Sequence, residues 1–218
     1  MQFDGQFETH VTVHADDAAG VTALRNWAAS RGLKFHHIVL DHGQTPSQPM
    51  VTRTASGTLP GQLAEAKRLA RELADAGFPV RRVKVEAAPG NRDVPANDDE
   101  ATRHVGRYFE HHVKLALPAG IDLVGLAELA GGHGARLSRN ARRDRDDGTS
   151  ERFVTQRCCG VGWATARREF DGLRTALAAA GYVAMKVEQE YVVADSNLGD
   201  DAGWLDGTLS PETPGETP

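Results

Sequence analysis

The stretch Phe7-Glu-Thr-His-Val-Thr-Val13 returns in the second half of the chain as Phe109-Glu-His-His-Val-Lys-Leu115. Both stretches alternate apolar and polar side chains, which is the period of a half-buried β-strand. Each carries a glutamate and a histidine two residues apart on its polar side. One strand pattern with one embedded pair, written twice, indicates that the chain contains two related units.

Further matches extend this likeness along both halves. His10 aligns with His112 and Gly32 with Gly134 without a gap. At nearly the same shift, the stretch 50–52 (Met-Val-Thr) aligns with 153–155 (Phe-Val-Thr). We therefore predict that the halves are copies produced by an internal duplication.

Each copy is expected to contain a strand, a helix, two strands, a second helix and a last strand. The two helices of the first copy have capping residues at Asp16 or Asp17 and at Thr58. The helices of the second copy are expected near 120–131 and 162–180. Strands are predicted at 7–13, 34–40, 48–54 and 80–86, and again near 108–115, 135–141, 152–158 and 183–193.

This element order fits the ferredoxin-like arrangement, in which both helices cover one face of a sheet and leave the other face open. Two fused copies resemble the dimeric α+β barrels, where the open faces of two such sheets are packed together. The expected fold class is therefore α+β with two tandem ferredoxin-like (βαββαβ) repeats. The expected boundaries are a first repeat at 1–87, a linker at 88–106, a second repeat at 107–194, a capping segment at 195–206 and a disordered tail at 207–218.

Composition narrows the class of protein. The chain has 218 residues, 40% of them hydrophobic, which is enough to bury a core. Its formal net charge of -5 argues against a general nucleic-acid binder, because phosphate contacts need a positive surface. No apolar run approaches the ~20 residues that span a bilayer, and the start lacks the pattern of a signal peptide. A cytoplasmic monomer or homodimer that does not enter the membrane is therefore expected.

The open sheet face carries the candidate site. Strand alternation sends the apolar residues toward the helices and leaves the glutamate-histidine pairs on the other face. Glu8, His10, Glu110, His112 and Lys114 are the candidate catalytic residues. The same face is predicted to present a set of ligand-binding residues from the other strands, namely Thr52, Lys84, Arg139, Thr155, Arg157, Lys186, Glu188 and Glu190.

Three chemistries suit such a face. Two imidazoles and two carboxylates, from Glu8, His10, Glu110 and His112, are suitable ligands for Zn, Mn or Fe. Alternatively, a histidine beside a glutamate is an oriented general base, and Lys114 or an arginine holds an anionic group of the substrate. The third possibility is simple binding of an anionic ligand.

Two resemblances favour phosphate-bearing ligands. His10-Val11-Thr12-Val13 resembles the His-x-Thr-x signature of two-histidine phosphoesterases, although the second copy, His112-Val113-Lys114-Leu115, lacks the required Thr or Ser. Glu110-x-His112-x-Lys114, with Glu188-x-Glu190, resembles the Glu-x-Glu-x-Lys strand of CYTH-type triphosphate hydrolases, with histidine at the central position. Both resemblances imply a substrate that carries phosphate.

The sequence thus favours an enzyme, a hydrolase or lyase, that acts on a small anionic molecule in a polar cavity between the two repeats. The chemistry is acid/base or metal-assisted. The alternative is a non-catalytic binding or regulatory module for a charged small ligand. A third possibility is a structural protein in which the repeated pair is a relic of duplication.

Overall fold

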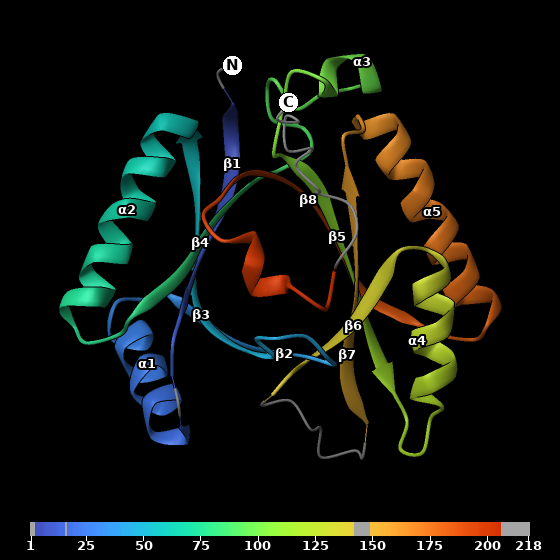
Figure 1. Ribbon diagram of the computed structural model, residues 1–218, viewed down its shortest axis with the longest axis horizontal. Helices are drawn as coiled ribbons and strands as arrows, with labels where there is room; N and C mark the ends of the chain where they lie inside the picture. Colours follow the sequence, from blue (N-terminus) through green and yellow to red (C-terminus); the bar gives the residue numbers. More distant parts are fainter. Residues whose placement is uncertain (1–2, 16, 142–148, 206–218) are drawn as a thin grey trace, which may run out of the picture.

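The computed structural model describes residues 3–15, 17–141 and 149–205. Within them the chain adopts an α+β fold with an eight-stranded antiparallel sheet and five α-helices (Figure 1). The elements in chain order are β1 (Asp4–Val13), α1 (Ala18–Ser30), β2 (Lys34–Leu40), β3 (Ser47–Thr58), α2 (Leu59–Asp75), β4 (Val80–Ala87), α3 (Asp98–Ala101), β5 (Tyr108–Leu117), α4 (Leu123–Gly132), β6 (Ala135–Asn140), β7 (Ser150–Cys159), α5 (Trp163–Ala179), β8 (Ala184–Asp195) and the 3-10 helix η1 (Leu198–Asp201).

The strands and the four long helices lie where the sequence pattern predicted them. Asp17 caps α1 by accepting a hydrogen bond from Gly20 N at 2.7 Å, and Thr58 caps α2 by accepting one from Gly61 N. Asp16, the alternative cap, lies outside the described residues. Strand β3 is longer than predicted, because it continues to the residue that caps α2.

The strands close into a barrel in the order β1-β3-β2-β6-β7-β5-β8-β4. Each half contributes four neighbouring strands, and the halves join where β2 pairs with β6 and β4 pairs with β8. The expectation that two open faces pack together therefore needs correction: the sheets meet edge to edge and share one curved wall. Edge pairing satisfies backbone groups that an open sheet would leave exposed, and it leaves the charged faces around an interior. The internal duplication itself remains a prediction.

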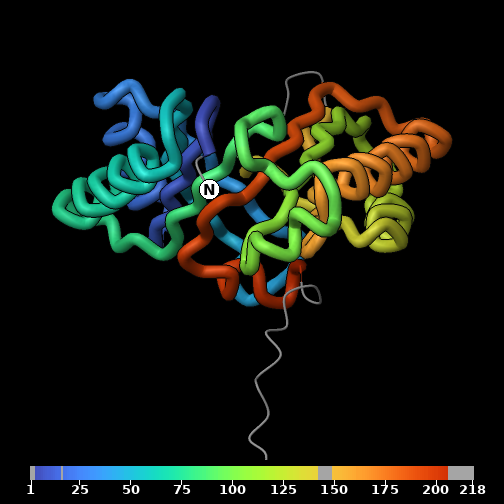
Figure 2. The backbone as a smooth tube through the Cα atoms, turned by 90° about the horizontal axis from the view of Figure 1, so that it is seen from above, coloured from blue at the N-terminus to red at the C-terminus, as the bar shows by residue number. Residues whose placement is uncertain are grey.

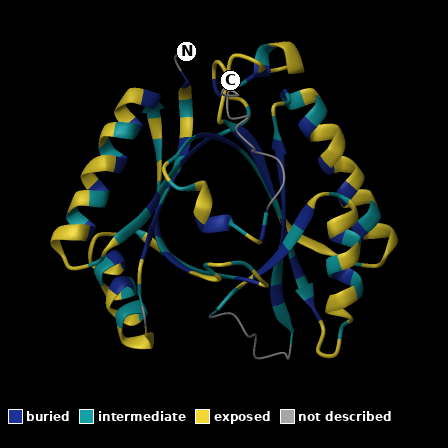
Figure 3. Ribbon diagram, viewed as in Figure 1, coloured by how far each residue is buried: buried dark blue, intermediate teal, exposed yellow. Residues whose placement is uncertain are grey.

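The apolar sides of the strands pack against the helices outside the barrel, as alternation predicted. In the first half Val11, Val13, Leu24 and Leu73 are fully buried together. The second half forms a similar cluster that includes Val113, Leu115, Leu126, Phe170 and Leu173. Seen from above, the helices of the two halves lie at opposite ends of the molecule (Figure 2). Their outer faces are the main exposed surface (Figure 3). The inner sides of the strands are thus left to form the site.

The predicted linker at 88–106 is folded onto the body. Asp98 Oδ1 accepts a hydrogen bond from Gly162 N at 2.8 Å, and Pro95 O accepts one from Trp163 N at 2.8 Å. These groups satisfy backbone donors at the start of α5. Gly162 is required there, because a Cβ would approach the backbone of Asn97 to 2.2 Å. At its other end, Asn91 Nδ2 donates to Gln6 O at 2.7 Å. The segment therefore contacts both halves.

The segment after β8 turns into one end of the barrel, where η1 is visible inside the ring of strands in Figure 1. Trp204 is buried and its Nε1–H donates to Leu137 O at 2.8 Å. Asp200 and Asp201 are also buried. The predicted tail at 207–218 lies outside the described residues. None of the helices that the structure describes is long and apolar enough to cross a membrane.

Candidate functional site

The barrel encloses a cavity of about 330 Å³ that is lined by side chains from all eight strands and from the C-terminal segment. Alternation along the strands decides which side chains reach it, because every second residue points inward. Most of the site residues predicted from the sequence meet here. Those that line the cavity are Glu8, His10, Lys84, Glu110, His112, Lys114, Thr155, Lys186, Glu188 and Glu190.

Three predicted ligand-binding residues have other positions. Thr52 is buried behind His10, and Arg157 is buried beside Glu110. Arg139 was expected in the cavity and is not there. Its neighbours in the chain, Ser138 and Asn140, line the cavity, so Arg139 lies on the outer side of β6 at a second cavity of about 540 Å³.

A continuous chain of polar contacts connects the histidines of the two pairs, His10 and His112. His10 Nε2 lies 2.8 Å from Glu86 Oε2, and Glu86 Oε1 lies 2.6 Å from Lys84 Nζ. The same ammonium lies 2.5 Å from Glu110 Oε1, which is 3.5 Å from His112 Nε2. The pairs therefore converge in one interior, as predicted, although a lysine that was assigned only to ligand binding joins them.

The carboxylate that contacts His10 is not the predicted one. Glu8 lies on the same strand as His10, but its contact is with Lys34, at 3.8 Å. The partner is Glu86 on β4, the diagonal neighbour of His10 in the sheet. The same-strand and diagonal positions lie at a similar distance from His10, about 7–8 Å between backbones. Spacing therefore does not decide between them, and Glu8 contacts Lys34 instead.

Each imidazole is also held by a threonine from the adjacent strand. His10 Nδ1 lies 2.8 Å from Thr52 Oγ1, and His112 Nδ1 lies 2.9 Å from Thr155 Oγ1. The two threonines occupy matching positions directly opposite their histidines. One ring nitrogen of each histidine is thus fixed by a hydroxyl, and the other faces carboxylates.

Burial and charge set the protonation state of the two carboxylates beside Lys84, Glu86 and Glu110. Burial alone would raise the pKa of Glu86, but Lys84 and His10 outweigh it and hold that pKa well below its ordinary value. Burial would also raise the pKa of Glu110, but the positive charges of Lys84 and Arg157 outweigh it and hold that pKa well below its ordinary value. The pKa of Lys84 itself is raised, because these two carboxylates outweigh its burial. This cluster is therefore fully ionised near neutral pH.

The corresponding carboxylate of the second half behaves in the opposite way. Glu190 faces Glu110 as Glu86 faces Glu8, and Glu190 Oε2 lies 3.7 Å from His112 Nε2. Burial and the nearby charge of Glu86 raise the pKa of Glu190 well above its ordinary value, with Lys84 acting against them. The register explains the contrast, because Lys84 stands opposite His10 whereas Glu188 stands opposite His112.

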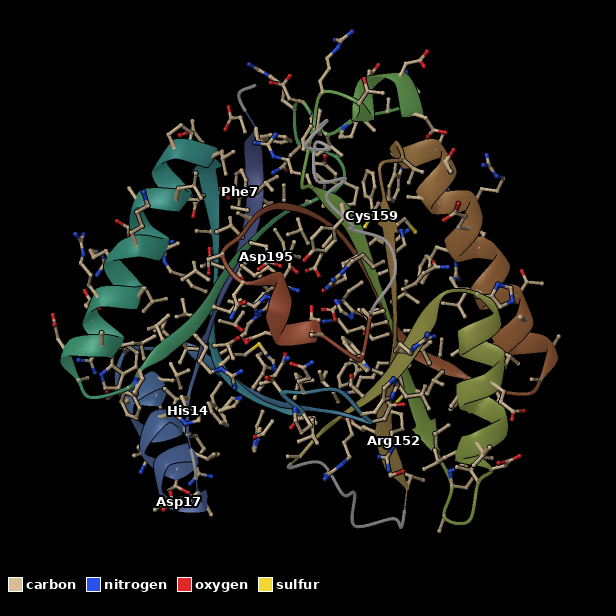
Figure 4. The ribbon with its side chains drawn as sticks, viewed as in Figure 1. Phe7, His14, Asp17, Arg152, Cys159 and Asp195 are labelled. Carbon is tan, nitrogen blue, oxygen red and sulfur yellow. The ribbon has the colours of Figure 1, made fainter. Side chains whose placement is uncertain are left out.

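Buried arginines connect the barrel wall to the C-terminal segment. Arg82 Nη1 lies 3.0 Å from Asp201 Oδ1, and Arg157 Nη2 lies 2.5 Å from Asp201 Oδ2. Arg82 also pairs with Asp195 on β8, whose pKa is lowered because that pair outweighs burial. Figure 4 labels Asp195 inside the ring of strands, whereas Asp17 lies at the outer end of α1.

The predicted four-ligand metal site is not assembled. Within the part of the chain that the structure describes, no group of three or more His, Cys, Asp or Glu side chains is placed to hold a metal ion. The physical reason is that the Lys84 ammonium lies between Glu86 and Glu110, and Glu8 contacts Lys34. This geometry does not support a Zn, Mn or Fe site formed by Glu8, His10, Glu110 and His112, and that site stays a prediction.

The cavity wall also contains apolar side chains that the sequence pattern did not predict as site residues. Ile38, Leu40, Met50, Phe153 and Trp204 all line it. A signal for two of them was present in the sequence, because Met50 and Phe153 occupy matching places in the two halves of the chain. Neither residue was predicted to belong to the site, because the prediction considered only polar and charged residues on the inward face.

Comparisons with known proteins identify no family. No family model matches the chain, and no curated protein matches it. Among solved structures, the acetolactate synthase small subunit of Thermotoga maritima is 13% identical with a TM-score of 0.32, covering 87% of this chain and 95% of that one. The regulatory subunit of aspartate kinase from Thermus thermophilus is 11% identical with a TM-score of 0.33, covering 81% and 95%. Chlorite dismutase from Candidatus Nitrospira defluvii is 12% identical with a TM-score of 0.28, covering 87% and 91%. Scores in this range do not establish a shared function.

Proposed function

We propose that the protein is an enzyme that binds a small anionic molecule in the barrel cavity and moves a proton on it, with Glu190 as the acid and His112 as the base. The observation that carries the proposal is the contrast between the two matching carboxylates. Glu86 is held ionised, whereas the raised pKa of Glu190 favours its protonated form. A carboxyl that stays protonated in a cavity and lies 3.7 Å from an imidazole nitrogen, as Glu190 lies from His112, is suited to donate a proton beside a base.

The second-half pair is the one that reaches a ligand. His112, Thr155 and Glu190 all line the cavity, whereas Glu86 and Thr52 do not. In one tautomer, His112 Nδ1–H donates to Thr155 Oγ1 and Nε2 keeps its lone pair. That nitrogen is then available to accept a proton from the ligand, while Glu190 can donate one at a pH where an ordinary glutamate is already ionised.

Acid/base chemistry fits this interior better than a metal. The ammonium of Lys84 already neutralises Glu86 and Glu110, and a divalent cation beside it would be repelled. The pair His10 and Glu86 is then a supporting group, because both ring nitrogens of His10 have partners at 2.8 Å. It helps to hold Lys84 in place.

The preference for an anionic ligand rests on Lys34. Its side chain is 63% exposed and its contact with Glu8 is 3.8 Å, so the pair is loose and weak. The other cations that line the cavity have closer partners, such as Glu151 at 2.7 Å from Lys114. An anionic group can therefore replace Glu8 at Lys34 with little loss of protein contacts.

The second candidate function is a non-catalytic binding or regulatory module for a charged small ligand. One observation favours it: the cavity cations are already paired with carboxylates of the protein. A cavity whose charges are largely satisfied can hold a ligand without activating it. The two candidates differ in whether Glu190 and His112 are needed for a chemical change.

A turnover screen separates the two. The full-length protein is incubated with a small-molecule cell extract, and consumption of each compound is followed by mass spectrometry. We expect at least one anionic compound to be consumed by the wild type and not by Glu190→Gln or His112→Gln. A control, Glu128→Gln on the outer helix α4, should retain the activity. Consumption that survives in both cavity variants, or no consumption at all, would reject the enzyme.

A further inference from the structure

The apolar residues of the cavity are gathered on one side of the barrel. Met50 lies on β3, Ile38 and Leu40 on β2, and Phe153 on β7. These strands belong to one continuous arc, β3-β2-β6-β7. Trp204 adds its ring from the C-terminal segment. The remaining residues of the arc that line the cavity include the uncharged polar side chains Gln48, Ser138, Asn140 and Thr155.

The charged residues lie on the other arc, β5-β8-β4-β1. It carries every formally charged strand residue of the cavity wall except Lys34, which lies on β2. Glu190 and His112, the proposed acid and base, belong to this charged arc. The cavity therefore has one ionic side and one largely apolar side.

Packing against the helices does not require these apolar side chains. Val51 and Val154, the next residues along β3 and β7, are fully buried on the helix side of the sheet. Met50 and Phe153 point the other way and are only partly buried. Apolar surface that stays in contact with water costs free energy in proportion to its area. A ligand with an apolar body removes that cost.

We infer that the ligand is an amphipathic anion: a compact aromatic or branched apolar body that contacts Met50 and Phe153, and one anionic group that Lys34 attracts. The inference rests on the proposed function only in placing the ligand in this cavity. Lys34 is on the apolar arc itself, and Lys114 Nζ lies 5.9 Å from the centre of the Phe153 ring. One cation therefore lies on the apolar arc and another lies beside the Phe153 ring. Inorganic anions and fully polar metabolites would leave this apolar surface in contact with water.

Matched pairs of probes test the inference. Isothermal titration calorimetry on the full chain, at one pH and one ionic strength, compares benzoate with acetate and phenyl phosphate with inorganic phosphate. The two pairs distinguish a carboxylate from a phosphate group. In at least one pair the aromatic member should bind at least about tenfold more tightly, as expected when an apolar ring is buried.

Two substitutions locate the effect. Phe153→Ala and Met50→Ala should each weaken binding of the aromatic probe at least about fivefold and leave the small anion unchanged. Met185→Ala is the matched control, because Met185 lies on β8, is 44% exposed and does not line the cavity. Thermal unfolding shows whether each variant is folded. If Phe153→Ala is not, Phe153→Leu and Met50→Ala provide the test.

Three results would overturn the inference. They are equal affinity within both pairs, no measurable binding of any of the four probes, and aromatic binding that the Phe153 and Met50 variants leave unchanged. The enzyme proposal can fail separately. If the aromatic probes bind as expected while the turnover screen finds no reaction, the amphipathic ligand stands and the protein is a binding module.

Discussion

The ammonium of Lys84 lies 2.5 Å from Glu110 Oε1, although β4 and β5 are not neighbours in the barrel and β8 runs between them. The contact joins the first half of the chain to the second at the centre of the cavity wall. It also makes the two halves unlike, because the position that matches Lys84 in the second half is Glu188. Lys84 thus keeps Glu86 and Glu110 ionised, whereas the matching position beside Glu190 is occupied by another carboxylate, Glu188.

Lys84→Met should strongly destabilise the protein. It leaves Glu86 and Glu110 buried with less positive charge beside them, and breaking a buried ion pair costs about 3–5 kcal/mol. Urea unfolding at pH 8 measures the loss. The loss should shrink at pH 5, because without Lys84 the pKa values of the two carboxyls rise and they take up protons.

Lys186→Met is the control for this change. Lys186 is 62% exposed and pairs with Glu188 at the cavity mouth, so its loss should cost less than about 1 kcal/mol. Equal losses for the two lysine variants, or an equal loss at both pH values for Lys84→Met, would show that Lys84 does not organise the buried carboxylates.

Alternation along the strands was sufficient to predict the inward face. It placed Glu8, His10, Glu110, His112 and Lys114 on one side, because the strand period of two leaves only two choices. It could not show that His10 uses Glu86 instead of Glu8. That pairing depends on the order of strands in the barrel, which joins residues far apart in the sequence.

The apolar side of the cavity and the C-terminal contacts were missed for a related reason. Met50 and Phe153 read as ordinary apolar residues, and only barrel closure shows that they face a cavity. The partners of Asp201 are Arg82 and Arg157, on strands from different halves. Nothing local in the sequence signals such a contact. Arg139 was predicted on the wrong face, because it shares the phase of Ala135 and Leu137, which pack on the helix side of β6.

The C-terminal segment should contribute to stability through Asp201. Asp201→Asn removes a carboxylate that is shared by two buried arginines, although Arg82 keeps Asp195 and Arg157 keeps Glu110. We expect a loss of about 2–4 kcal/mol in chemical denaturation at neutral pH, somewhat below the full cost of an unpaired buried charge. The matched control is Asp171→Asn on α5, whose carboxylate is 52% exposed and pairs with Arg174. A loss no larger than that of the control would contradict the role of Asp201.

The two matching carboxylates should give opposite pH dependences. The pKa of Glu86 is lowered in the folded protein, so its contribution to stability is present above the ordinary glutamate pKa of 4.5 and is lost as pH falls. Glu86→Gln should therefore be destabilised at pH 7 and less so at pH 4. The raised pKa of Glu190 has the other sign, because the wild type loses stability as pH rises from 4.5 toward the folded value.

Glu190→Gln removes that loss, so its stability relative to wild type should increase from pH 4 to pH 8. Unfolding free energies of both variants across this range give the two slopes. Slopes of the same sign would mean that the two carboxyls share one environment, and the contrast on which the proposed acid and base rest would be wrong.

The most direct test of the acid and base assignment is the pKa of Glu190 in the folded protein. This pKa can be measured by NMR in a protein labelled with ¹³C at glutamate, by following the side-chain carboxyl carbons as the pH is changed. The signal that disappears in Glu190→Gln belongs to Glu190. We predict that the signal titrates well above the ordinary pKa of 4.5, because burial and Glu86 disfavour the charged form. A Glu190 signal that titrates at or below 4.5 would show that it is ionised at neutral pH and cannot be the proton donor.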